Sequence, residues 1–124
     1  MAVRSPVRDE LIDIIRCFMR RVGVSEAILY GSRARDDHIK TSDVDLMVIS
    51  PRFEGVRFMD RLPPLHHQWD PSLPFLEVLA YTPEEFERAK EGLGIERIAA
   101  ETGIRITLDD EAEGLNGETG DEDA

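Results

Sequence analysis

Residues 27–49 read AILYGSRARDDHIKTSDVDLMVI, and this stretch decides the fold. It contains an apolar run, a Gly-Ser turn, a polar connector with basic residues, and a second apolar run entered through two aspartates. Short apolar runs bounded by turn residues are typical of buried strands. We therefore expect strands at residues 26–30 and 43–49, with the chemistry of the protein concentrated at Gly31-Ser32, Asp43 and Asp45.

The two aspartates are placed to share a cation. Side chains alternate along a strand, so Asp43 and Asp45 project from one face with their Cα atoms about 7 Å apart. Two carboxylates ~4 Å apart repel by about 4 kcal/mol at an effective dielectric near 20, and a divalent cation removes this repulsion. Oxygen-only ligands favour Mg²⁺ or Mn²⁺. Glu77, in a later predicted strand, could complete a three-carboxylate site suited to two-metal phosphoryl or nucleotidyl transfer.

The Gly31-Ser32 turn has the complementary chemistry. Glycine lets backbone N–H groups approach a phosphate closely, and the serine hydroxyl adds a donor. Nearby cations for a triphosphate are Arg33, Arg35 and Lys40. Each motif alone is usually a simple strand end, but their combination with a third carboxylate favours a functional site. The glycine-lysine signature of a Walker-type loop and the later acids of a calcium-binding loop are both missing.

Two helical segments are predicted around these strands. Apolar residues recur at helical spacing from Val7 to Val22, with Ser5-Pro6 as N-cap and first helical residue and Gly23 as the stop. The sequence Thr82-Pro83-Glu84-Glu85 is typical of a capping box at a helix start. We expect that helix to pause at residues 92–94, to resume at 95–102 and to end at Gly103.

Two further strands are expected in the second half of the chain. Residues 74–81 (PFLEVLAY) are so apolar that we expect a central, buried strand, and residues 104–108 are predicted to form an edge strand. Residues 52–73 are ambiguous, because Pro63-Pro64 must break or restart any helix. The predicted fold class is therefore α/β (α+β), a small mixed sheet packed with helices.

The distribution of charged residues indicates how the chain is divided and which ligands it can bind. Eight of the 26 acidic residues lie in residues 109–124, which leaves 18 acids against 15 Lys and Arg in residues 1–108. We therefore interpret 1–108 as one domain and 109–124 as an acidic, disordered tail. A nearly neutral domain without clustered cations is a poor binder of long nucleic acid. No long apolar segment or leader is present, so we expect a cytoplasmic protein without membrane association.

Two other residue patterns are expected to be structural. The single cysteine, Cys17, excludes an intramolecular disulfide, and its helical context predicts a buried or half-buried side chain. His66-His67 invites a metal interpretation, but neighbouring side chains diverge on a helix and no third ligand has suitable spacing. We expect this pair to lie at the surface or to pack against a loop.

The motifs resemble those of a known family. Residues 31–35 (GSRAR) and 42–48 (SDVDLMV) resemble the signature of the minimal nucleotidyltransferases, a small branch of the DNA polymerase β-like superfamily. Residues 77–86 (EVLAYTPEEF) are similar to the family's third-strand motif. The resemblance spans about residues 8–108. It implies the polymerase β-like nucleotidyltransferase fold, Asp43, Asp45 and Glu77 as catalytic metal ligands, and Gly31-Ser32 as triphosphate contacts.

The sequence departs from the family pattern at two places. Asp36-Asp37 stand where the family often has glycine, and Glu77 stands where aspartate is common. The chain also leaves no room for the helical domain that holds the acceptor in aminoglycoside nucleotidyltransferases. The resemblance therefore implies a separate partner, often a helical HEPN ribonuclease toxin to which the antitoxin transfers AMP from ATP with Mg²⁺.

Two alternatives follow from those departures. The protein could be an antitoxin that masks its partner by contact, with a vestigial site, or a nucleotide-binding regulatory module without transfer. The predicted edge strand at residues 104–108 also allows pairing with another chain, and hence a homo-oligomer.

Overall fold

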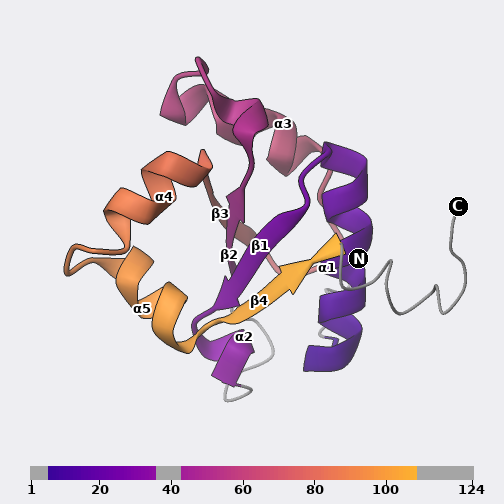
Figure 1. The fold of residues 1–124 in the computed structure, drawn as a ribbon. Coiled ribbons are helices and arrows are strands. Elements are labelled where there is room, and N and C mark those ends of the chain that lie inside the picture. Colours follow the sequence, from indigo (N-terminus) through magenta and orange to yellow (C-terminus); the bar gives the residue numbers. More distant parts are fainter. Residues whose placement is uncertain (1–5, 36–42, 109–124) are drawn as a thin grey trace, which may run out of the picture.

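The two strands of the decisive stretch pair with each other antiparallel. In this computed structural model, which describes residues 6–35 and 43–108, β1 (Glu26–Tyr30) and β2 (Val44–Ile49) are neighbours. β4 (Ile104–Thr107) pairs antiparallel with the other side of β1, and β3 (Leu76–Tyr81) pairs parallel with β2. The sheet order is β3-β2-β1-β4, and the sheet is mixed, as predicted (Figure 1).

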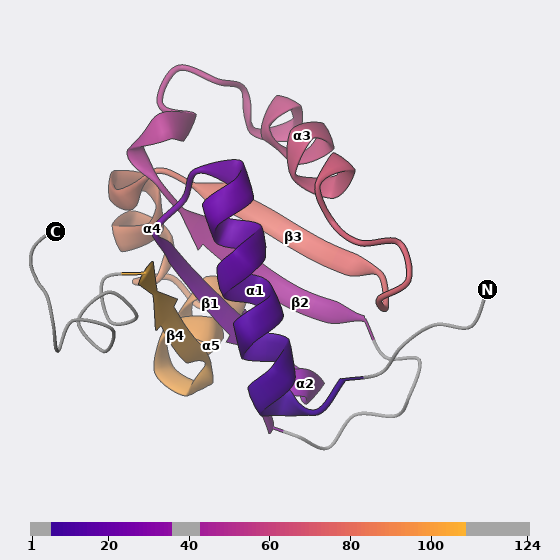
Figure 2. The same ribbon diagram turned by 90° about the vertical axis from the view of Figure 1, so that its right-hand side faces the viewer.

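Helices cover both faces of this sheet. They are α1 (Arg8–Val22), α2 (Ser32–Arg35), α3 (Leu62–His67), α4 (Pro83–Ala89) and α5 (Ile95–Thr102), with 3-10 turns at Pro51–Phe53 and Phe58–Arg61. α1 and α3 contribute to the core on one face, whereas α4 and α5 pack on the other (Figure 2). The predicted fold class, helices around a small mixed sheet, is confirmed.

The strands are apolar because both of their faces are buried. Leu46 and Val48 point into the core beneath α1, whereas Met47 and Ile49 point into the smaller core beneath α4 and α5. The same alternation runs through β1, where Ile28 belongs to the second core. A sheet with one face in solvent has strands in which apolar and polar residues alternate. Because both faces of this sheet are buried, its strands are apolar at nearly every position.

The first helix ends where the sequence predicted but begins later. Gly23 takes a left-handed conformation at φ 77°, and its N–H donates to the Met19 carbonyl at 2.9 Å. The N-cap is Val7, which offers no side-chain cap, so Pro6 precedes the helix rather than occupying its first turn. The predicted capping residue, Ser5, lies outside the described residues.

The strand β3 corrects one prediction. It lies at the edge of the sheet, not in its centre. Its outer edge is covered instead by side chains, because His66 bonds the Leu76 carbonyl at 3.0 Å and Arg61 donates to the Ala80 carbonyl at 3.0 Å. The prediction that residues 104–108 form an edge strand is confirmed by β4.

The ambiguous middle segment resolves into short turns and α3. Pro63 and Pro64 stand in the first turn of α3, where proline is tolerated because those N–H groups need no helical acceptor. The prediction for Cys17 is wrong: its thiol is exposed on α1, and Arg20 donates to its Sγ at 3.5 Å. Within the described ranges no helix is long and apolar enough to span a membrane. The predicted acidic tail, 109–124, lies outside them.

A buried arginine ties the middle segment to the sheet and to α4. Arg61 is 6% exposed and makes two bonds to Glu85, from Nη1 to Oε1 at 2.6 Å and from Nη2 to Oε2 at 3.1 Å. Its Nε also donates to the Val56 carbonyl at 2.9 Å. Glu85 completes the predicted capping box with Thr82, so one carboxylate both starts α4 and neutralises Arg61.

We predict that Glu85→Gln lowers the free energy of unfolding by about 1.5–3 kcal/mol at pH 7, the usual range for hydrogen bonds to a charged group. Hydrogen bonds from Arg61 lower the pKa of Glu85 from 4.5 to about 2. The contribution is therefore complete above the unfolded-state pKa and is lost as the pH falls towards 2. Urea unfolding should show the difference between the two proteins shrinking with acidification.

Glu84→Gln is the matched control, because Glu84 is exposed in the same helical turn. Equal destabilisation by both variants, or a difference that does not change with pH, would contradict the role given to the Arg61–Glu85 pair.

Candidate active site

Three polar side chains are aligned across three strands. In the strand pairing, Asp45 stands opposite Tyr30 of β1 on one side and opposite Glu77 of β3 on the other. Paired residues project from the same face of a sheet, about 5 Å from one strand to the next. Asp43 directly precedes β2 and is exposed, as is Glu77. The strand register therefore places the three carboxylates that the sequence singled out at the same end of neighbouring strands.

Gly31 is required by the position of Asp45. It has φ 76°, and a Cβ placed on it would lie far inside van der Waals distance of Asp45 Oδ2. The backbone at the end of β1 thus lies directly against the carboxylate, and a side chain at position 31 would force the Asp45 carboxylate to move. This contact joins the two sequence motifs into one site.

The predicted phosphate contacts are only partly presented to solvent. Ser32 begins α2 and is half-buried. Arg35 is exposed, and its positive charge partly offsets the effects of burial, Glu77 and Asp43 that raise the pKa of the Asp45 carboxyl. Arg33, expected as a triphosphate contact, is instead 1% exposed, and burial lowers its pKa. Its guanidinium therefore lies inside the domain. The remaining cation, Lys40, lies outside the described residues.

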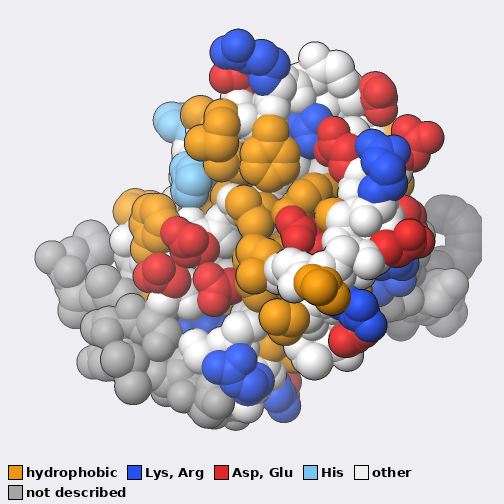
Figure 3. Space-filling view, turned by 90° about the vertical axis from the view of Figure 1, so that its left-hand side faces the viewer, with side chains coloured by type: hydrophobic (Ala, Val, Ile, Leu, Met, Phe, Trp, Pro, Cys, Tyr) orange, Lys and Arg blue, Asp and Glu red, His pale blue; other side chains and the backbone are white. Residues whose placement is uncertain are grey.

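Electrostatic repulsion is concentrated on Asp45. Burial raises the pKa of Asp45, and the charges of Glu77 and Asp43 raise it further, against the opposing effect of Arg35. Burial, together with the negative charges of Asp45, Glu77 and Glu96, also raises the pKa of Tyr30 to about 12. In the view from the α4 and α5 side, acidic side chains gather beside histidine and hydrophobic side chains (Figure 3). A group of carboxylates that oppose each other's ionisation favours binding of a cation.

The residues suit a divalent metal ion in their number and chemistry. Asp43, Asp45 and Glu77 are hard oxygen ligands of the type that Mg²⁺ and Mn²⁺ prefer. In residues 6–35 and 43–108, however, no three His, Cys, Asp or Glu side chains lie close enough together to hold an ion. The strand register is compatible with a metal site, but the side chains of Asp43, Asp45 and Glu77 would have to move closer together to form one.

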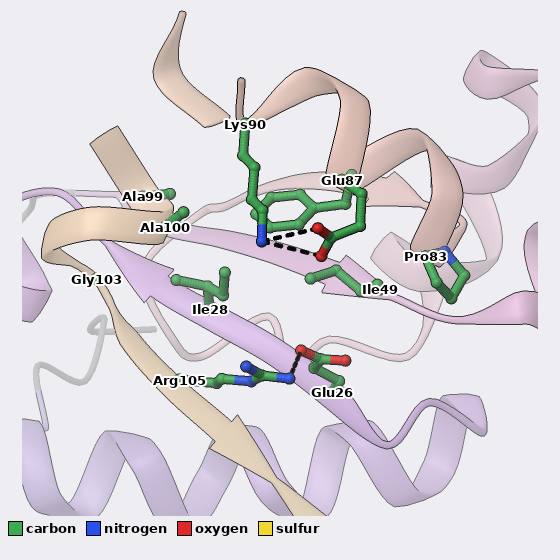
Figure 4. Close-up of a pocket in the computed structure, with 11 residues that line it drawn as sticks. Glu26, Ile28, Ile49, Pro83, Glu87, Lys90, Ala99, Ala100, Gly103 and Arg105 are labelled. Atoms are coloured by element: carbon green, nitrogen blue, oxygen red, sulfur yellow. Dashed lines mark hydrogen bonds and ion pairs between the residues drawn. The ribbon is translucent and has the colours of Figure 1, made fainter. Parts of the chain in front are cut away.

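A separate cavity lies at the opposite end of the sheet. It has a volume of about 170 Å³ between α4, α5 and the strands, with Ile28 and Ile49 in its wall. Its polar rim is paired, Lys90 with Glu87 and Arg105 with Glu26 (Figure 4). Because Glu26 begins β1 and Tyr30 ends it, this cavity does not belong to the carboxylate site.

Sequence reasoning did not identify Tyr30 as part of the site. Its ring packs against the second core, and its strand partner is Asp45. The only local signal was its position directly before Gly31, which does not distinguish a site residue from an ordinary strand residue.

We predict that Gly31→Ala destabilises the protein more than Gly55→Ala. Both glycines have φ near 77°, so both substitutions carry about 1–2 kcal/mol of left-handed strain. Only at Gly31 does the new methyl group meet a carboxylate, because no atom lies within 4 Å of a Cβ at Gly55. Urea unfolding measures the excess loss, and equal losses would contradict the close approach of Gly31 to Asp45.

We also predict that Asp45→Asn stabilises the metal-free protein by about 0.5–2 kcal/mol at neutral pH, the usual gain from relieving an unfavourable surface charge. The pKa of Asp45 is raised in the folded state, so its ionisation opposes folding and the advantage of Asn disappears in acid. Mg²⁺ should reverse the order by stabilising only the wild type. Thermal melts in EDTA and in Mg²⁺ test this, and a variant less stable in EDTA would contradict it.

The chain is similar to known proteins in sequence and in fold. The model of the family described as "Nucleotidyltransferase domain" matches residues 11–105. A crystal structure of a candidate nucleotidyltransferase from Sulfolobus solfataricus is similar in fold, with a TM-score of 0.51 and 18% identity over 66% of this chain and 76% of that one. No curated protein matches significantly. The family match covers most of the chain and includes both motifs, and the chain therefore belongs to the nucleotidyltransferase domain family.

Proposed function

We propose that this protein transfers AMP from ATP to a protein acceptor, using Mg²⁺ or Mn²⁺. Nucleotidyltransferase domains generally use nucleoside triphosphates and divalent metals, and this chain belongs to that family. The observation that carries it is the pairing of Asp45 with Glu77 across β2 and β3, next to Gly31. This arrangement supplies carboxylates for a cation and a close backbone turn for phosphate at adjoining positions.

The chemistry would proceed as a single displacement. A hydroxyl oxygen of the acceptor forms a bond to the α-phosphorus of ATP and loses its proton to solvent. The bond from that phosphorus to the α–β bridging oxygen breaks, and pyrophosphate leaves. A divalent ion held by Asp43, Asp45 and Glu77 would lower the charge on the phosphates and on the attacking oxygen. The N–H groups at Gly31-Ser32, with Arg35 and Lys40, would hold the triphosphate.

The openness of the site supports a macromolecular acceptor. Asp43 and Glu77 are exposed, and Glu77 lies on β3 at the edge of the sheet. A folded partner can therefore reach the carboxylates without entering a deep cleft. We further propose that the partner is a HEPN-type helical toxin and that the protein acts as its antitoxin, as the resemblance in residues 31–48 implies.

We predict that Glu77→Gln lowers the transfer rate by about 10²–10³-fold, because a metal ion contributes several kcal/mol and each 1.36 kcal/mol is a factor of ten. The assay incubates the protein with Mg²⁺, ATP labelled at the α-phosphate and the partner, and measures labelled partner. Glu101→Gln is the matched control, since Glu101 pairs only with the exposed Arg97 on α5 in the contacts described. Absence of label with the wild type under varied metals would overturn the proposed activity.

A second candidate function is neutralisation by contact alone. It is favoured by the separation of the acidic side chains, which as placed do not enclose an ion within the described part of the chain. Asp43→Asn combined with Asp45→Asn distinguishes the two. Retained neutralisation of the partner supports binding alone, whereas lost neutralisation with an intact complex supports catalysis.

A further inference from the structure

Phe75 is an exposed aromatic residue at the edge of the carboxylate site. Its side chain is 59% exposed, although large apolar side chains are usually covered. Its backbone is fixed, because Val44 N–H donates to the Phe75 carbonyl at 2.8 Å and continues the β2–β3 pairing by one residue. The phenyl group is therefore presented to solvent from a rigid strand end.

His66 supports this ring from one side. The two rings are stacked, with centroids 5.6 Å apart and planes inclined by 25°. His66 is itself held in place, since its Nε2 lies 3.0 Å from the Leu76 carbonyl. A carbonyl only accepts, so Nε2 carries the hydrogen of this bond. The His66 ring thus packs against Phe75 and holds it in place, while most of the Phe75 surface remains exposed to solvent.

The position of Phe75 relates it to the carboxylates. Side chains alternate along β3, so Phe75 projects from the same face as Glu77, and its backbone lies beside Asp43. Gly31-Ser32 lies two strands away, at the end of β1, at roughly 10 Å. A nucleotide whose triphosphate begins at Gly31-Ser32 would bring its α-phosphate over the carboxylates. Its sugar and base would then extend towards β3.

We propose that Phe75, positioned by His66, is the stacking platform for the nucleobase of the nucleoside triphosphate. This inference rests on the proposed nucleotidyl transfer at the same site. The Phe75 ring, 59% exposed, offers a flat apolar surface next to Glu77. Such a surface recognises the flat face of a base rather than its hydrogen-bonding edge. The platform therefore favours purines through stacking strength and discriminates weakly between adenine and guanine.

The test measures nucleotide binding without any acceptor. Calorimetric titration with ATP and, separately, with inorganic tripolyphosphate in Mg²⁺ compares the wild type with Phe75→Ala, Phe75→Trp and Leu93→Ala. Loss of a stacked base weakens binding by about 5- to 150-fold. We expect this loss for ATP with Phe75→Ala, recovery with Phe75→Trp, and unchanged tripolyphosphate affinity in all variants. Leu93 is 91% exposed on the α4–α5 turn and controls for removal of a surface hydrophobe.

Several results would overturn the inference. Unchanged ATP affinity in Phe75→Ala would overturn it. If, in addition, this variant labelled less of the acceptor, Phe75 would contact the acceptor protein instead of the nucleobase. Equal loss of ATP and tripolyphosphate affinity would show a general disturbance of the site rather than stacking. A wild type that binds tripolyphosphate and ATP equally well refutes the base platform while leaving phosphate binding intact. A wild type that binds neither refutes the proposed function as well.

Discussion

The close approach of Gly31 to the carboxylate of Asp45 is the constraint on which the site depends. The antiparallel register of β1 and β2 ends at Tyr30 opposite Asp45, and the next residue must turn away at once. A left-handed glycine makes that turn and leaves no side chain between the backbone and Asp45 Oδ2. The Gly31-Ser32 turn and the strand that carries Asp45 are therefore in direct contact, which links the positions of the two sequence motifs.

A second set of contacts positions the remaining carboxylate. β3 lies at the edge of the sheet, so its outer carbonyls need partners other than a strand. Arg61 and His66, from the segment between β2 and β3, bond the carbonyls of Ala80 and Leu76. Arg61 also pairs with Glu85 in the capping box of α4. Glu77 thus lies on β3, which is bonded to β2 on one side and to the side chains of Arg61 and His66 on the other.

Much of this arrangement could be predicted, because its signals are local. The Gly-Ser turn, the alternation of Asp43 and Asp45, and the Thr82–Glu85 capping box each depend on residues close in sequence. The edge position of β3 could not, since an apolar strand looks central until Arg61 and His66 are seen to cover its edge. The burial of Arg33 also carries no local signal, because a charged residue in a motif is normally expected at the surface.

The parallel pairing of β2 with β3 also has a consequence for folding. β1 and β2 are joined through a short connector, whereas residues 50–75 separate β2 from β3. Parallel neighbours require such a crossover, and closing a long loop is slower than forming a local pair. We therefore expect Asp45 to meet Gly31 before the crossover closes and places Glu77 beside it. A chain in which the crossover is still open lacks Glu77 opposite Asp45, because the two residues meet only through the β2–β3 pairing.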